Sequence, residues 1–168
     1  MAYGTGCRQR VQRNQKVINK LLVKRTRFYL KRADNSIVTL YELTLFCFLT
    51  GNADMHLKNF SLWRSDAQTI ALTPAYGLLA TKLLLPTDME EMNLSLNGKK
   101  SHLREADWLA FVQYLGLTDR QRTNVHQRFR KRLVSALSWI DISFLTADSQ
   151  VAYRNLLAGR ARQLGLMD

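Results

Sequence analysis

The chain has 168 residues, of which 46% are hydrophobic, and it contains seven Phe, six Tyr and three Trp. This length suits a single domain and this composition a packed core, so the two together exclude a disordered chain. The longest uncharged apolar run, residues 43–50, is too short to span a membrane, and residues 1–15 lack the apolar segment of a secretory signal. We therefore expect a cytoplasmic protein with no membrane segment.

The net charge of +12 is concentrated near the N-terminus. Residues 1–38 hold ten Lys and Arg against Asp34 alone, a balance of +9, whereas residues 39–168 hold fifteen against twelve acidic residues, a balance of +3. A cationic segment of this kind would attract the phosphates of DNA. The alternative is a solvated, partly helical segment without a partner, because a run of charge specifies no ligand. Residues 1–38 therefore stay unassigned.

Helical patterns dominate the first third of the chain. An amphipathic helix is predicted for residues 15–31, a turn for "ADNSIV" (residues 33–38), and a helix that is apolar nearly all round from Thr39 to Thr50. The dipeptide Gly51-Asn52 marks the end of that helix. Two β-type runs, "NFSLW" and "TIALT", then flank "RSDAQ" and predict a hairpin.

Three amphipathic helices are predicted after Pro86. Their apolar positions recur at helical spacing, and they lie within residues 104–117, 120–140 and 146–166. The first should end at Gly116, and Thr118 or Asp119 should cap the second, whose outer face is basic. The two apolar faces consist of Trp108, Phe111, Val112 and Leu115, and of Val125, Phe129, Leu133 and Leu137. The predicted fold class is mainly α with a small β-hairpin.

Polar chemistry gathers in "GNADMHLKN", residues 51–59, directly after the most apolar helix. Asp54 and Asn59 have the spacing of the kinase catalytic loop, H-R-D-x-x-x-x-N. There a carboxylate accepts the proton of the attacking hydroxyl and an amide oxygen holds Mg²⁺, while Lys58 could offer positive charge to a phosphoryl group. The spacing alone occurs in many unrelated chains, so Asp54 and Asn59 could equally be loop and turn residues, and His56 a structural histidine. Cys7 and Cys47 form no metal-binding spacing, and Cys47 is expected to be an inert buried thiol.

A longer string of residues resembles a known family. "LFCFLTGNADMHLKNFSL", followed by "LTPAYGLLATKLLLP" and "LSLNGKK", looks like the C-terminal half of the HipA family, bacterial Ser/Thr protein kinases that act as toxins of type II toxin–antitoxin pairs. The resemblance covers about residues 40–168. It implies a HipA-like C-terminal kinase lobe at residues 39–168, with ATP and Mg²⁺ as cofactors. It also implies a DNA-binding HipB-type antitoxin as partner and a protein substrate such as an aminoacyl-tRNA synthetase.

Residue by residue, the resemblance implies that Asp54 is the catalytic base and Asn59 the Mg²⁺ ligand, with Lys58 beside it at the cofactor and His56 orienting the loop. The chain departs from the family at Gly77, which stands where the family's "TPAYD" carries its second metal-binding carboxylate. Loss of that carboxylate should cripple phosphoryl transfer, because the transition state depends on the metal. The candidate carboxylates to replace it are Asp66, Asp88 and Glu90.

A second departure is that residues 1–38 show no sign of the family's N-terminal lobe, which carries a phosphate-covering loop and a nucleotide-gripping Lys. Three interpretations follow. The chain is a working kinase completed by a separate N-lobe companion chain, a catalytically dead lobe that still docks an antitoxin, or a decayed fragment. The resulting prediction is a HipA-like kinase lobe that lacks its N-lobe and is catalytically impaired.

Overall fold

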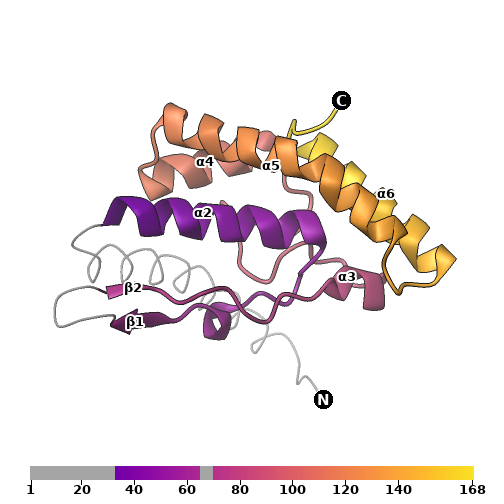
Figure 1. Ribbon diagram of the computed structural model, residues 1–168. Coiled ribbons are helices and arrows are strands. Elements are labelled where there is room, and N and C mark those ends of the chain that lie inside the picture. Colours follow the sequence, from indigo (N-terminus) through magenta and orange to yellow (C-terminus); the bar gives the residue numbers. More distant parts are fainter. Residues whose placement is uncertain (1–32, 65–69) are drawn as a thin grey trace, which may run out of the picture.

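The computed structural model describes residues 33–64 and 70–168 (Figure 1). Its elements, in chain order, are α2 (Ala33–Thr50), the short 3₁₀ helix η1 (Leu57–Asn59), β1 (Leu62–Arg64), β2 (Ile70–Leu72), α3 (Thr81–Leu84), α4 (Glu105–Leu115), α5 (Asp119–Asp141) and α6 (Ala147–Gln163). The predicted fold class, mainly α with a small β-hairpin, is confirmed. The helix predicted for residues 15–31 lies outside the described residues. Within the described part, every helix is too short or too polar to cross a bilayer.

Helix α2 is the centre of the fold. Figure 1 shows it in indigo between the α4–α5 layer and the β-hairpin, and it contacts α4, α5, α6 and β2. Tyr41, Leu45 and Phe48 are completely buried. Because neighbours cover the helix on several sides, its sequence is apolar nearly all round instead of along one stripe.

The structure corrects the predicted start of this helix. Residues 33–38 were predicted as a turn, but they form the first part of α2, which begins at Ala33 and not at Thr39. Asp, Asn and Ser favour turns, and they are also well suited to the first turn of a helix. Ile37 and Leu40 are both buried in the core, so packing extends the helix through a segment whose local sequence suggested a turn.

The remaining elements follow the sequence patterns. Strand β1 pairs antiparallel with β2, with Leu62 opposite Leu72, as the hairpin prediction required. Helix α4 ends at Gly116, which has a φ of 66°, and the Thr118 side chain accepts the N–H of Gln121 to cap α5. The edge of the Trp108 ring packs on Phe48 at 5.2 Å between centroids. The predicted apolar faces of α4 and α5 thus form the core against α2.

A buried cation joins α6 to the end of α2. Arg160 is only 8% exposed, and its guanidinium carbon lies 4.7 Å from the centroid of the Phe48 ring. Its Nη1 donates to the backbone carbonyl of Phe48. Burial lowers the pKa of Arg160, while the charge of Glu91 opposes that shift. This contact fixes the helix end from which the polar loop at residues 51–59 leaves.

A buried carboxylate holds the start of α4. Asp107 is 1% exposed, and its oxygens accept the backbone N–H of Arg104, the Asn97 amide and the Lys99 ammonium, each at 3.0 Å. Burial alone would raise the pKa of Asp107, but these hydrogen bonds and the Lys99 charge outweigh it and hold that pKa below its usual value. The turn around Asn97 is thereby tied to the helix.

Candidate active site: the loop after helix α2

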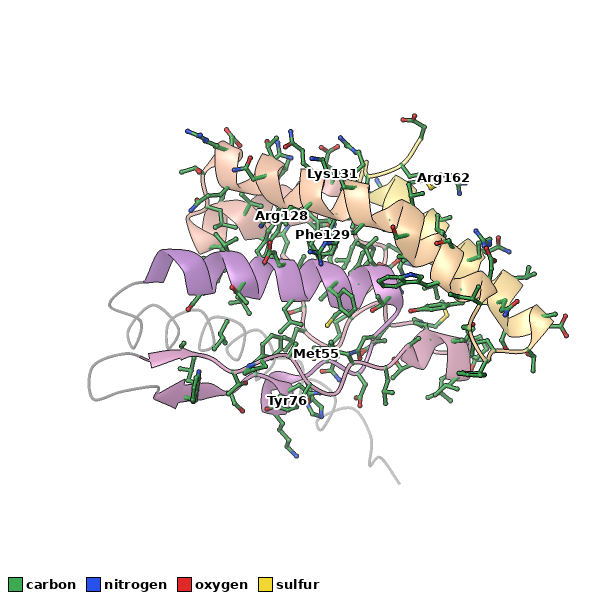
Figure 2. All side chains as sticks on the ribbon, viewed as in Figure 1. Met55, Tyr76, Arg128, Phe129, Lys131 and Arg162 are labelled. Carbon is green, nitrogen blue, oxygen red and sulfur yellow. The ribbon has the colours of Figure 1, made fainter. Side chains whose placement is uncertain are left out.

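The polar loop begins where α2 ends. Gly51 has a φ of 75°, a conformation that glycine adopts without strain, and the N–H of Asn52 bonds the carbonyl of Cys47 at 2.9 Å. Asp54 lies in the following turn and is exposed, whereas Met55 is 2% exposed. Figure 2 labels Met55 on the side of the loop nearer α2 in this view. A buried anchor thus holds a loop that presents Asp54 to solvent.

The other predicted loop residues follow within one turn. Lys58 is exposed, His56 and Asn59 are half-buried, and the N–H of Asn59 donates to the carbonyl of His56 at 2.9 Å. The Nδ1 atom of His56 is buried and has no hydrogen-bond partner among the described residues. The structure therefore places these side chains on one short loop, while the role of His56 in orienting it stays a prediction.

Gly77 lies directly against Asn59. It has a φ of 66°, and a Cβ atom built on it would lie 2.6 Å from Nδ2 of Asn59. The structure therefore brings together the predicted first metal ligand and the position of the missing carboxylate, although they are 18 positions apart in the sequence. Among the described residues, Asp54 makes no hydrogen bond or ion pair with either of them.

Three side chains that the sequence interpretation missed join the two segments. The Asn52 amide donates to the carbonyl of Gly77 at 3.0 Å. The Tyr76 hydroxyl lies 2.8 Å from the carbonyl of Lys58 and 2.7 Å from the Ser61 hydroxyl (Figure 2). The Thr81 hydroxyl accepts the N–H of Ala53 at 2.8 Å and donates to the carbonyl of Gly51 at 3.2 Å. No spacing signal reveals these contacts, because each spans 15 or more residues.

The described residues do not fit a complete catalytic Mg²⁺ site. Mg²⁺ prefers oxygen ligands in an octahedron, with one or two carboxylates from the protein. Asn59 would supply an amide oxygen, but Gly77 supplies no side-chain ligand. The searched part of the chain contains no group of three His, Cys, Asp or Glu side chains that could hold a metal. Binding of Mg²⁺ and ATP stays a prediction.

Of the three carboxylates considered as substitutes for the one missing at Gly77, two have other partners and the third lies outside the described residues. Asp88 accepts the N–H of Glu90 at 2.9 Å, and the Glu90 carboxylate pairs with Lys100 at 2.8 Å. Asp66 falls outside the described residues. Cys47 also offers no ligand, because burial raises the pKa of its thiol to about 12 and keeps it protonated. This agrees with the expected inert thiol.

Comparison with known proteins decides the family. The family model described as "HipA-like C-terminal domain" matches residues 8–137. The chain belongs to this family. The match begins inside the basic segment that the sequence interpretation left unassigned, so the HipA-like region includes most of residues 1–38.

The HipA-like chain is also similar in sequence to two proteins described as putative kinases. It is 60% identical over 60 residues to "Putative kinase Y4dM" of Sinorhizobium fredii, a match that covers 35% of the chain and 15% of that relative. It is 31% identical over 144 residues to "Putative kinase Y4mE" of the same organism, covering 80% of the chain and 33% of that relative. The chain thus spans a third or less of the length of these relatives.

A solved structure shares the fold. The HipA toxin of Shewanella oneidensis MR-1, solved with HipB and its operator DNA, superposes with a TM-score of 0.64 at 24% identity. The similarity covers 76% of this HipA-like chain and 32% of the matched chain. At this level of identity the similarity establishes the fold alone. The chemistry must be argued from the residues of the site.

Proposed function

We propose that this chain is the C-terminal lobe of a HipA-like Ser/Thr protein kinase, the toxin of a type II toxin–antitoxin pair in the cytoplasm, with impaired phosphoryl transfer. The observation that carries the proposal is the contact between Gly77 and Asn59. This contact supports the proposal because it puts Asn59, the predicted metal ligand, beside a residue without a side chain, at the position where the family carries its second metal carboxylate.

Each loop residue has a defined part in this proposal. Asp54 is an exposed carboxylate that can accept a proton from a Ser or Thr hydroxyl of a protein substrate, for which the family suggests an aminoacyl-tRNA synthetase. Lys58 is exposed on the same loop and can offer positive charge to a phosphoryl group. Asn59 is the remaining oxygen donor for Mg²⁺, which would neutralise the charge of ATP phosphates when bound. A separate N-lobe companion chain could complete the nucleotide site.

The first test restores the carboxylate. Gly77→Asp should raise the affinity for Mg²⁺-ATP by about tenfold or more over the native chain in titration calorimetry, because it adds an anionic ligand beside Asn59. The Asn59 amide must rotate aside, since a Cβ atom at position 77 would come within 2.6 Å of it. Asp is among the side chains that best tolerate the positive φ found there.

The matched control is Gly77→Asn, which imposes the same backbone strain and crowding without a negative charge. We expect no gain in Mg²⁺-ATP affinity from this variant. Equal gains from the two variants would contradict a metal-ligand role for position 77. Efficient phosphoryl transfer by the native chain, abolished by Asp54→Asn, would contradict the proposed impairment itself.

The second candidate function is that of a binding module for a HipB-type antitoxin. Large apolar side chains are exposed around the connection between α5 and α6, where Trp139 is 68% exposed and Phe144 fully exposed. Exposed apolar patches of this kind mark interaction sites on monomeric proteins. The Shewanella HipA was solved together with HipB, which makes an antitoxin of that type the partner that we propose.

For this second function we expect antitoxin binding to be independent of nucleotide. The dissociation constant measured by calorimetry should change less than about twofold when Mg²⁺-ATP is added, because this surface lies on different elements from the Asp54 loop. Phe144→Ser should weaken binding about tenfold or more, as the loss of an exposed aromatic anchor does. The control is Met89→Ser, which changes an apolar residue that is 76% exposed and lies outside this surface. Binding that requires Mg²⁺-ATP, or equal losses in the two variants, would rule this function out.

A further inference from the structure

A pocket of about 170 Å³ lies between α2, α4, α5 and the residues that follow α6. Its lining consists of Tyr41, Glu105, Trp108, Leu109, Arg122, His126, Arg130, Leu164 and Gly165. Neither the loop at residues 51–59 nor Gly77 lines this pocket. The pocket is therefore separate from the proposed active site, and its use does not depend on the proposed function.

The lining is cationic. Arg122 and Arg130 face Glu105 as the single acidic lining residue. Arg130 donates to the carbonyl of Gly165 at 2.6 Å, and Arg122 Nε forms an ion pair with the exposed carboxylate of Asp119 at 3.9 Å, a distance beyond hydrogen-bond range. The nearby Arg128, in contrast, is hydrogen-bonded to Glu42. Two guanidinium groups at the pocket thus lack a hydrogen-bonded carboxylate among the described residues.

Two buried donors in the pocket wall have no acceptor. Trp108 is 3% exposed, and its indole Nε1–H has no hydrogen-bond partner among the described residues. The same is true of the Nε–H of Arg122. Buried donors are nearly always paired, so two unpaired N–H groups in one wall call for an acceptor that this part of the chain does not supply. Since both groups only donate, a ligand that pairs with them must supply acceptor atoms.

Two further lining residues, Tyr41 and His126, also favour a negatively charged ligand. The Tyr41 hydroxyl and His126 Nε2 are 2.9 Å apart. Burial, followed by the charges of Arg122 and Arg130, lowers the pKa of His126, and Glu105 opposes the shift. The positive charges of Arg122 and Arg130 therefore both act on His126, which lines the pocket. A ligand with negative charge would relieve this accumulation of positive charge.

We propose that this pocket binds a small phosphate-bearing ligand. Its phosphoryl oxygens would accept hydrogen bonds from the indole of Trp108 and from the guanidinium groups of Arg122 and Arg130. Three donors on three side chains suit a tetrahedral oxyanion better than a planar carboxylate, and guanidinium groups match phosphate geometry. Both N–H groups are covered by protein atoms in this structure, so the proposal requires side chains at the pocket to move as the ligand enters.

Titration with inorganic phosphate, followed by ¹⁵N–¹H NMR of the full chain, tests the proposal. The three Trp indole N–H signals report three places in one experiment, because Trp63 and Trp139 are exposed and do not line the pocket. We expect a saturable shift of the Trp108 signal and little change in the other two at constant ionic strength. Parallel shifts of all three, or no saturable shift of Trp108, would overturn the proposal.

Matched charge variants identify the donors. Arg122→Gln should weaken phosphate binding about tenfold or more, as the loss of a charge-assisted hydrogen bond does. Arg120→Gln removes the same charge from an exposed position two residues away and should leave the affinity unchanged. If Arg122→Gln does not fold, the phosphate affinity of Arg130→Gln is measured in its place, and it should be weakened in the same way. Equal weakening by Arg120→Gln, or equally tight binding of acetate, would overturn a phosphate site.

Discussion

Replacing Arg160 with alanine is expected to lower the free energy of unfolding by about 2–4 kcal/mol. The variant leaves a cavity where the buried aliphatic stem lay, and it removes the cation from the face of the Phe48 ring. It also removes a donor from the carbonyl of Phe48, in the last turn of α2. Urea unfolding followed by circular dichroism measures the loss.

Two further variants separate the causes. Arg160→Met keeps most of the buried volume and should cost less than alanine, because an apolar group of similar size avoids the desolvation of a buried cation. Arg162→Ala, at an exposed position of the same helix, should change stability by less than about 0.5 kcal/mol. If alanine at position 160 costs no more than alanine at position 162, the guanidinium does not join α6 to α2.

Asp107→Asn is expected to lower the free energy of unfolding by about 2–3 kcal/mol at neutral pH. The carboxylate is buried with three donors aimed at it, including the Lys99 ammonium, and an amide can accept from only part of this set. The start of α4 and the turn around Asn97 would loosen together. Asp148→Asn, an exposed residue in the first turn of α6, is the control and should change stability little.

The cost of Asp107→Asn should depend on pH. The pKa of Asp107 is lower in the folded protein than in the unfolded chain, where an Asp titrates near about 3.9. Its contribution is therefore complete above the unfolded pKa and is lost as the pH falls through the folded pKa. The difference in unfolding free energy between the native protein and the variant should be constant from pH 7 to about 5, and should shrink below about 4. A difference that grows with acidity would show that the carboxylate is not stabilised as an anion.

Much of the fold could be predicted from the sequence, because strong patterns coincide with packing. Gly116 and Thr118 end and begin helices where local rules place them, and the apolar faces of α4 and α5 are the faces that pack on α2. The prediction was wrong at residues 33–38, where Asp, Asn and Ser suggested a turn. Burial of Ile37 and Leu40 against distant elements decided that segment, and no local pattern contains that information.

The candidate site was predictable only in part. The spacing of Asp54 and Asn59 pointed to one loop, and the position of Gly77 came from the resemblance to a family. The structure adds that Gly77 touches Asn59, and that Asn52, Tyr76 and Thr81 join the two segments. Such contacts depend on how α2 and the hairpin bring distant residues together. The unpaired indole of Trp108 was equally hidden, since its position on an apolar face predicted only core packing.

The bonds between the two segments also govern how this region can open. The amide hydrogen of Ala53 is held by the Thr81 hydroxyl, and that of Lys82 by the carbonyl of Gly51. Neither amide can meet water unless residues 51–53 and 81–82 separate, so the two should exchange for deuterium in one cooperative event. We therefore expect residues 51–53 and 81–82 to open as one unit, because backbone and hydroxyl contacts hold them together.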